Sequence, residues 1–461
     1  MMRYLVALAS AAALLAFAVP AEAQAGTGGE PPPAGVVSPA PPTNLPHLPA
    51  STSQVQQVRQ LVQCGGTMYA VGTFATIRRN SSTYTRDNIF SFSATAPYQV
   101  TSWAPDVVGT YGTTSNASNT LNTIAFANGN CADAYIGGEF SSVNGTAVND
   151  IAEISTATGN VVTAFKSSAS APVETILAAG NHLLVGGRFT SINGDTTDPY
   201  LVSLSPATGQ SDGFLHLNIS GNYQFTGVSS NATHVYNQQL SPDDTLDLVE
   251  GDFTTVGGQA RQQAFMLNVS GTSATVTGWN VPEFTTNCAT VEPFYVQAGA
   301  WSPDGSTVYF GTTGYHPNGQ PIGATPRTGP CDAALAFPTT QAAVSALWTN
   351  YTGCDSLYAA AADAKAAYFG GHERWSMNPQ DCDAEGPGAI PAPGMEGVDP
   401  ATGALYLNSA GTAGYYSHDR GLGADDMLIT SAGLWIASDN YDDTQYCGGV
   451  STSGICFLPY S

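Results

Sequence analysis

The 461-residue chain is poor in charge, and above all in positive charge. Only 10% of its residues are charged, and 12 Lys and Arg stand against 35 Asp and Glu, which gives a formal net charge of −23. Nucleic acids and anionic membrane surfaces attract basic proteins, so this balance argues against both as partners. With so few charged residues, the surface must consist largely of Ser, Thr, Asn and Gly.

Helical patterns and cofactor motifs are also missing. Beyond the N-terminus no segment places apolar residues at the 3.6-residue spacing of an amphipathic helix, which excludes a helical protein. No phosphate-binding loop is present, no cysteine pair has the C-x-x-C spacing of a zinc site, and His372-Glu373-Arg374-Trp375 is not the H-E-x-x-H motif. We therefore expect no cofactor, apart from a structural calcium ion that the loop at 439–443 could hold.

A repeated phrase is the strongest positive feature of the sequence. Its clearest copies are Tyr135–Gly145, Val185–Gly194 and Val249–Gly258, with the form Gly-Gly-x-Phe-Thr-x-Val-Asn-Gly. Seven copies, four of them weaker, can be aligned on one position that recurs every 49 to 67 residues: Gly72, Gly138, Gly187, Gly251, Thr312, Gly371 and Ser438. One such unit cannot bury its own apolar face, so the copies must pack against one another.

Each copy contains short strand patterns separated by turn signals. In the third copy, Val173–Leu177 and Leu183–Val185 flank a turn at Gly180-Asn181, and the strong turn signal Asn193-Gly194 follows. The sequence therefore predicts an all-β fold, a seven-bladed β-propeller of four-stranded antiparallel blades. The Gly-Gly pair inside the second strand indicates a close approach of the neighbouring blade.

The last copy supplies only three strands, which would leave one sheet edge open. Proteins avoid open edges, so we expect residues 45–58 to add the missing outer strand and close the ring. Residues 1–23 read as a secretory signal peptide, 24–50 as a Pro/Gly/Ala-rich linker that cannot build a core, and 51–461 as the propeller. These features predict a secreted or cell-wall-associated monomer that does not insert into a membrane.

Eight cysteines in an exported chain predict disulfides. Cys447 and Cys456 flank one loop, and Cys64 and Cys131 occupy similar places in adjacent copies, so we expect these two pairs. The other four cysteines allow three pairings, among which we slightly favour Cys354 with Cys331 or Cys382.

The repeated phrase, followed by a strand and Ala-Thr-Gly, resembles the bacterial delta-60-type repeat, a β-propeller repeat of secreted proteins. Segments of the C-terminal third resemble a set of exported propellers from high-GC Gram-positive bacteria: Tyr368–Trp375, Gly386–Gly394, Gly433–Asp439 and Phe457–Pro459. The resemblance covers about residues 55–461. It implies a fold and an extracellular location, and it brings no catalytic motif with it.

The candidate site follows from the expected propeller topology. Loops that enter first strands and loops that join second to third strands open on one face, where seven residues of adjacent blades would meet: His372, Glu373, Arg374, Trp375, Asp425, Asp426 and Asp439. Glu174 and Asp355 would face the same channel mouth. A Trp beside Arg, His and carboxylates suits sugar binding; the alternatives are that Trp375 packs between blades and that Arg374 forms a structural salt bridge with Asp425 or Asp426.

Two functions remain open. The first is a non-catalytic binding module that recognises a cell-envelope or extracellular glycan or protein. The second is a polysaccharide hydrolase or lyase with carboxylates such as Asp425 and Asp426 at the channel mouth. Adjacent residues of a regular strand point to opposite faces, which weighs against this pair as acid and base.

Overall fold

The computed structural model describes residues 29–51, 55–109, 120–127, 129–223, 232–286, 288, 295–315, 329–409, 411, 413, 416–417, 423–441, 446–447 and 450–461. The predicted signal peptide lies outside these residues. The described chain is all-β and contains, besides strands, one 3-10 turn at Pro282–Thr285. No helix in this part of the chain is long and apolar enough to cross a membrane.

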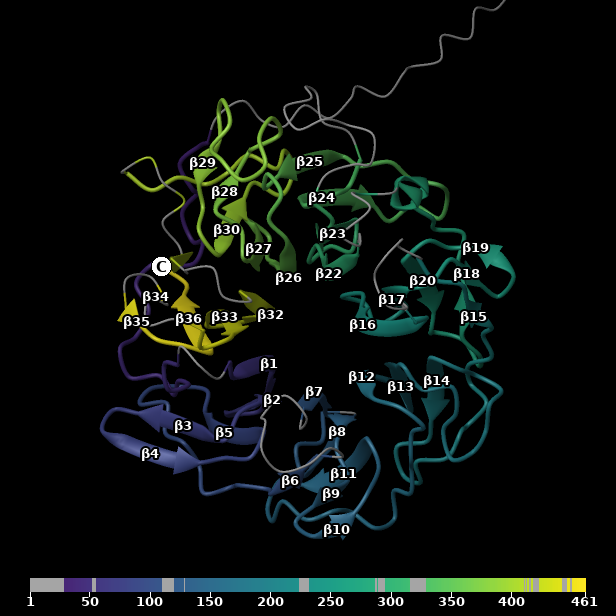
Figure 1. The fold of residues 1–461 in the computed structure, drawn as a ribbon. Coiled ribbons are helices and arrows are strands. Elements are labelled where there is room, and N and C mark those ends of the chain that lie inside the picture. Colours follow the sequence, from purple (N-terminus) through teal and green to yellow (C-terminus); the bar gives the residue numbers. More distant parts are fainter. Residues whose placement is uncertain are drawn as a thin grey trace, which may run out of the picture.

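Seven antiparallel sheets of three or four strands form the body of the described chain (Figure 1). The first contains β1 (Gln57–Cys64), β2 (Thr67–Thr73) and β5 (Ile89–Ser93), and the second contains β7 (Thr120–Ala125), β8 (Asp133–Glu139) and β11 (Ile151–Ser155). The third contains β12 (Val173–Ala179), β13 (His182–Gly187) and β14 (Leu201–Leu204). The fourth contains β16 (His234–Leu240), β17 (Leu246–Asp252), β20 (Ala264–Asn268) and β21 (Thr275–Val276).

The remaining three large sheets follow the same order. The fifth contains β22 (Val296–Trp301), β23 (Thr307–Thr312), β24 (Ala333–Pro338) and β25 (Trp348–Tyr351). The sixth contains β26 (Leu357–Ala362), β27 (Ala367–Gly371) and β30 (Met395–Val398), and the seventh contains β32 (Ala424–Thr430), β33 (Gly433–Ser438) and β36 (Ile455–Pro459).

Five smaller sheets form in the connecting loops. Their strands are β3 (Thr76–Arg79) with β4 (Ser82–Thr85); β6 (Val107–Val108), β9 (Ser142–Val143) and β10 (Thr146–Ala147); β15 (Ile219–Ser220), β18 (Thr255–Val256) and β19 (Gln259–Ala260); β28 (Trp375–Ser376) with β29 (Ile390–Pro391); and β31 (Tyr416–Ser417), β34 (Tyr446–Cys447) and β35 (Val450–Ser451).

The first strand of each large sheet lies nearest the centre of the molecule (Figure 1). These innermost strands are β1, β7, β12, β16, β22, β26 and β32; each contacts the next, and β32 contacts β1. The second strands are buried on both faces: β33 is buried at all six positions, because a neighbouring sheet covers each side of it. Apolar clusters therefore span adjacent sheets, as where Val71 of the first packs with Ile136 of the second.

The Ala-Thr-Gly motifs form a common turn at the outer edge of three sheets. Gly159, Gly209 and Gly403 each have a positive φ and donate a backbone hydrogen bond to the residue four positions earlier. The turn brings the chain back along the outer strand in single bridges such as Ile154–Val161 and Leu204–Ser211. A fourth strand was predicted for every blade. Among the described residues it forms a ladder of two or more paired residues only in the fourth and fifth sheets.

The N-terminal segment adds to the last sheet, but not at the predicted residues. Val37 pairs antiparallel with Tyr460, and Ser38 N donates to the Pro459 carbonyl over 2.7 Å. Residues 45–51 and 55–58 instead lie between the last sheet and the first: Leu45 and Leu48 are buried there, and Val58 already belongs to β1. The prediction that 24–50 cannot build a core is therefore wrong for the described residues. Proline holds this segment extended, so it can lie along sheet edges without a strand-like sequence.

A β-bulge recurs in every innermost strand. The register shifts by one residue at the same place in all seven sheets, and the residue before each shift pairs with one of the seven aligned positions of the repeated phrase. A Cβ on Gly72, Gly187 or Gly251 would lie only 2.0–2.4 Å from the carbonyl oxygen of Gln57, Pro172 or His234, respectively. Glycine recurs there because the bulge presses a backbone carbonyl against it.

The other glycine of each Gly-Gly pair is required for a different reason. A Cβ on Gly137 would lie 2.5 Å from Val173 Cγ1, and a Cβ on Gly370 would lie 2.6 Å from Met427 Cε. Both neighbours belong to the next sheet. The interpretation that this position permits a close approach of the adjacent sheet is confirmed.

Four disulfides join the described cysteines, and none of these cysteines is free. The two expected pairs, Cys447–Cys456 and Cys64–Cys131, are both present, and the latter links the first and second sheets. The remaining pairs are Cys354–Cys382, one of the two pairings that we favoured, and Cys288–Cys331. Disulfides persist in oxidising compartments, so the chain is an extracellular or secreted protein.

Leu48 tests whether the N-terminal segment belongs to the core. Leu48 is fully buried beside aromatic residues of the first and last sheets, so Leu48→Ala should lower the free energy of unfolding by about 2–5 kcal/mol. Leu347, which is 48% exposed, is the matched control. Leu347→Ala should change the free energy of unfolding by no more than about 0.5 kcal/mol. Guanidinium denaturation of both variants measures the difference; equal effects would mean that the segment is a loosely attached linker.

The bulge explanation of the repeated glycine can be tested within one hairpin. Gly72→Ala should destabilise the protein by about 1–3 kcal/mol or more, because the new methyl group would meet the Gln57 carbonyl. At Gly66, in the same hairpin, nothing lies within 4 Å of an added Cβ, so Gly66→Ala should be close to neutral. Thermal melts of the two variants decide the matter, and a neutral Gly72→Ala would remove the steric explanation.

Candidate functional site

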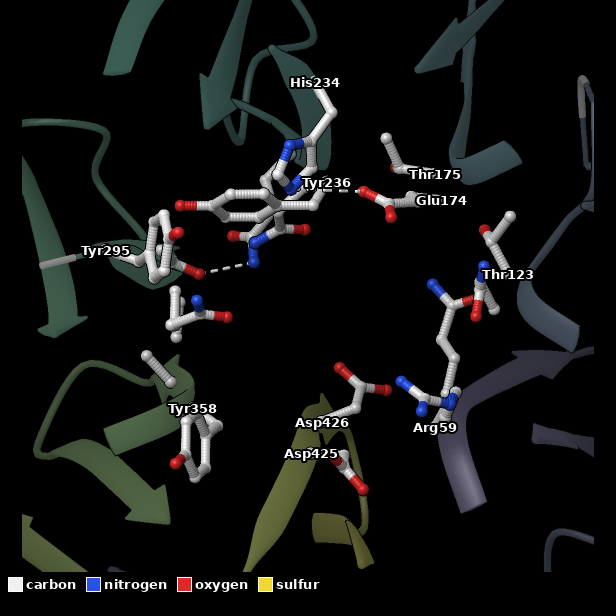
Figure 2. A pocket seen from close by; sticks show the side chains of 18 of the residues that line it. Arg59, Thr123, Glu174, Thr175, His234, Tyr236, Tyr295, Tyr358, Asp425 and Asp426 are labelled. Carbon is white, nitrogen blue, oxygen red and sulfur yellow. Dashed lines mark hydrogen bonds and ion pairs between the residues drawn. The ribbon is translucent and has the colours of Figure 1, made fainter. Parts of the chain in front are cut away.

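A cavity of about 540 Å³ lies at the centre of the molecule, and all seven innermost strands contribute to its wall (Figure 2). The bulge residue of every strand lines it: Arg59, Asn122, Glu174, Tyr236, Gln297, Tyr358 and Asp425. A bulge re-aims a side chain because the extra residue is not paired across the ladder. All seven side chains are polar or carry a polar group.

The bulge also brings a second residue of several strands to the cavity. Gln60, Thr123, Thr175, Asn237 and Asp426 directly follow bulge residues and line the same wall. Asp425 and Asp426 therefore face one space together, although alternation in a regular strand would separate them. The expectation that these two carboxylates point to opposite faces is wrong, because the register shifts between Ala424 and Asp426.

The carboxyl groups of β32 have unusual protonation. Leu61 N donates to Asp426 Oδ2 over 2.9 Å, and Asp425 Oδ2 has no hydrogen-bond partner among the described residues. Burial raises the pKa of Asp425 to about 8, against the opposing charge of Arg59, and raises the pKa of Asp426 to about 6. At neutral pH Asp425 is thus largely a neutral acid that can donate a hydrogen bond.

A second charged group lies on another part of the wall, where Glu174, Arg188 and His234 meet. Arg188 Nε lies 2.6 Å from Glu174 Oε1, and His234 Nε2 lies 3.7 Å from Glu174 Oε2. His234 Nδ1 lies 2.6 Å from the Ala232 carbonyl, to which Nδ1–H donates. Burial lowers the pKa of His234, with Glu174 opposing the shift, so its imidazole is neutral at physiological pH.

Three tyrosines complete the wall that Figure 2 shows: Tyr236, Tyr295 and Tyr358. The Tyr236 hydroxyl donates to the Val296 carbonyl, which fixes the ring beside that of His234, 5.2 Å away between centroids. The Tyr358 hydroxyl lies 3.4 Å from His372 Nδ1. Aromatic faces among polar groups offer apolar contact together with hydrogen bonding.

The sequence-predicted Arg374 and Trp375 are not among the residues that line the cavity. The Arg374 guanidinium forms a bidentate ion pair with Asp355, with N···O distances of 2.7 and 2.8 Å, and a further one with Asp383 at 3.0 Å. It also stacks 4.4 Å from the centre of the Trp375 ring. The alternative that Arg374 pairs with Asp425 or Asp426 is wrong; its partners lie within its own sheet region.

The predicted Glu373 and Asp439 are buried. His372 contacts the Tyr358 hydroxyl but is not among the residues that line the cavity. Asp439 accepts hydrogen bonds from Gly423 N and Tyr441 N over 2.9 and 2.5 Å, so it fixes the backbone at the start of β32. Of the seven predicted binding residues, the structure thus brings only Asp425 and Asp426 into the cavity, together with Glu174. Most of the other cavity residues lie inside the innermost strands, whereas the sequence-based prediction considered loops. Arg188, which follows β13, and Ala232 and Tyr295, which precede β16 and β22, lie outside these strands.

Glu373 forms a buried acidic pair with Glu396. Both are almost fully buried, and none of their carboxyl oxygens has a hydrogen-bond partner among the described residues. Burial raises the pKa of Glu373 well above its usual value, helped by the charge of Glu396, and raises the pKa of Glu396 to about 7. No group of three metal-binding side chains occurs in the described ranges, and Asp442 and Asp443 of the predicted calcium loop lie outside them.

Comparisons with known proteins give little guidance. No protein-family model matches the chain, and no curated protein matches it. Among solved structures, the chain is similar to the extracellular domain of a hybrid two-component system from B. thetaiotaomicron, at 12% sequence identity over 90% of this chain and with a TM-score of 0.43. It spans 39% of the length of that protein's chain. The likeness is too distant to bear on function.

The buried pair should make stability depend on pH. Between the ordinary glutamate value near pH 4.5 and pH 7, the folded protein keeps the Glu396 proton while the unfolded chain releases it. The contribution of Glu396 to stability should therefore fall as pH rises through this window, by up to about 3 kcal/mol, and then level off. Glu396→Gln should remove this loss.

Urea denaturation at a series of pH values measures the effect. The stability of Glu396→Gln relative to the unaltered protein should rise steadily from pH 4.5 to 7. Glu385→Gln, at an exposed glutamate of the same region, is the control and should leave the pH profile unchanged. Parallel profiles for the unaltered protein and Glu396→Gln would mean that Glu396 titrates normally.

Proposed function

We propose that this chain is an exported seven-bladed β-propeller of the delta-60-repeat type, which binds a saccharide of the cell envelope or extracellular space in its central cavity. Seven large sheets with innermost strands in cyclic contact support the propeller. The repeated phrase and the four disulfides support its kinship and export.

One observation carries the binding proposal: seven bulges, one in each innermost strand, direct seven polar side chains into one cavity. Apolar side chains could fill the centre without the free-energy cost of desolvating polar groups. A polar residue at the bulge of every innermost strand therefore favours a ligand-binding role for the cavity. The amides of Asn122 and Gln297 offer both donors and acceptors, and the tyrosines offer ring faces. This mixture matches a sugar, which has hydroxyls around its edge and apolar C–H groups on its faces.

A site centred on Trp375 has less support. The Arg374 side chain is engaged by two carboxylates, and its guanidinium covers one face of the Trp375 ring, which leaves less of both side chains for a ligand. We therefore assign Trp375 to the packing of its own loop sheet, β28 with β29.

Carbohydrate cleavage in the same cavity is the second candidate. Asp425 is a neutral acid at pH 7, and His234 is a neutral imidazole beside Glu174, so the wall offers one group that can donate a proton and another that can accept one. The non-catalytic function remains our first proposal because it needs only the polar wall.

Isothermal titration of the mature chain with fragments of cell-wall polysaccharide tests the proposal. The Gln297 side chain makes no hydrogen bond with any described residue. Gln297→Ala should therefore weaken binding by roughly tenfold without changing the melting temperature. Trp375→Ala is the control outside the cavity and should bind like the unaltered protein. Binding that depends on Trp375 and not on Gln297 would overturn the proposal, and release of oligosaccharides would favour cleavage.

A further inference from the structure

Two of the few cations of this chain lie in the central cavity. The sequence has only 12 Lys and Arg in 461 residues, yet both Arg59 and Arg188 line the cavity wall. Both side chains are exposed to solvent, Arg188 to 48%. The three carboxylates of the wall are less exposed, so the charged groups most accessible to a ligand are the two guanidinium groups.

Arg59 is the more available of the two. It occupies the bulge of β1, and it forms no ion pair or hydrogen bond with any residue that the structure describes. Neither carboxyl group of β32 forms an ion pair with it: Asp426 instead accepts a hydrogen bond from Leu61 N, and Asp425 is largely protonated at neutral pH. A guanidinium group that faces a cavity without a counterion binds anions strongly, because the cavity screens charge less than bulk water does.

Arg188 is anchored at one edge only. Its Nε donates to Glu174 Oε1 and one terminal nitrogen donates to His234 Nε2 over 3.4 Å, while its remaining N–H groups keep donor capacity. The Glu174 carboxylate offsets the Arg188 charge, so Arg188 contributes hydrogen bonds more than net charge. The wall thus offers one guanidinium group without an ion-pair partner among the described residues, that of Arg59, surrounded by polar donors and acceptors.

We propose that the ligand is an acidic saccharide, a sugar with a uronic carboxylate, and that Arg59 binds this carboxylate. This inference rests on the proposed function and names its ligand class. One unpaired guanidinium group fits a monoanion, whereas the nearby Asp426 and Glu174 carboxylates would repel a phosphate dianion more strongly. The planar fork of arginine matches a planar carboxylate through two parallel hydrogen bonds. Asp425, as a neutral acid, and the Gln60 amide then bind hydroxyl groups beside it.

Titration calorimetry with matched sugars tests the inference. The probes are oligosaccharides of galacturonate, glucuronate and mannuronate, together with the same oligomers after reduction of their carboxyl groups to alcohols. The unaltered protein should bind at least one acidic oligomer roughly tenfold or more tightly than its reduced form. Arg59→Gln should remove this preference and leave the affinity for the reduced form unchanged. Arg78→Gln, at an exposed arginine on β3, is the charge-matched control and should retain the preference.

The outcomes separate this inference from the proposed function. Equal affinities for acidic and reduced forms across all three sugars, or a preference that survives Arg59→Gln, would overturn the acidic-ligand inference and leave binding in the cavity intact. Tighter, Arg59-dependent binding of sulfated oligosaccharides would overturn the carboxylate assignment. If neither sugar binding nor binding of cell-wall fragments depends on Gln297, the proposed function itself fails.

Discussion

A β-bulge in each innermost strand is the constraint on which the rest of this structure depends. It forces a carbonyl oxygen against the second strand, which disfavours a side chain there and explains four of the aligned glycines: Gly72, Gly187, Gly251 and Gly371. Thr312 is one of the two aligned residues other than glycine, and its hydroxyl group donates to the Pro330 carbonyl over 2.5 Å. The same bulge leaves one inner residue unpaired and turned toward the centre. Within each bulge, the aligned residue of the second strand therefore shapes the backbone, while the bulge residue of the innermost strand supplies the polar group of the cavity.

This separation explains what the sequence could predict. Glycines, turn signals and cysteines repeat because the backbone needs them, so the all-β class and the pairs Cys64–Cys131 and Cys447–Cys456 could be inferred from the sequence. The bulge residues do not repeat: Arg, Asn, Glu, Tyr, Gln, Tyr and Asp occupy one structural position. Register is set by pairing between strands, so a sequence alone does not show which residue is turned inward. Asp425 and Asp426 were found only because they adjoin a loop, and Arg59, on the strand before the first aligned glycine, was missed.

The buried carboxyl groups change the meaning of the low charge content. Asp247, Glu250 and Glu396 lie within strands and Glu373 lies in the loop between β27 and β28, all with almost no exposure. Burial raises the pKa of Glu250 to about 8 and that of Glu396 to about 7, and it raises the pKa of Asp247 well above its usual value. A protonated acid between sheets carries no charge. The folded protein is thus less negative at neutral pH than the formal value of −23 indicates.

The pairing of Val37 with Tyr460 joins segments from opposite ends of the sequence. Ser461 Oγ also donates to the Val36 carbonyl, a contact between residues 425 positions apart. Among the described residues this contact closes the longest stretch of chain, so its loop-closure entropy cost is high. It can form only when the other sheets already hold the two segments near each other. The last sheet stays incomplete until both Val37 and Tyr460 are in place. A chain cut before residue 460 would therefore keep an open edge on its last sheet, which proteases can attack.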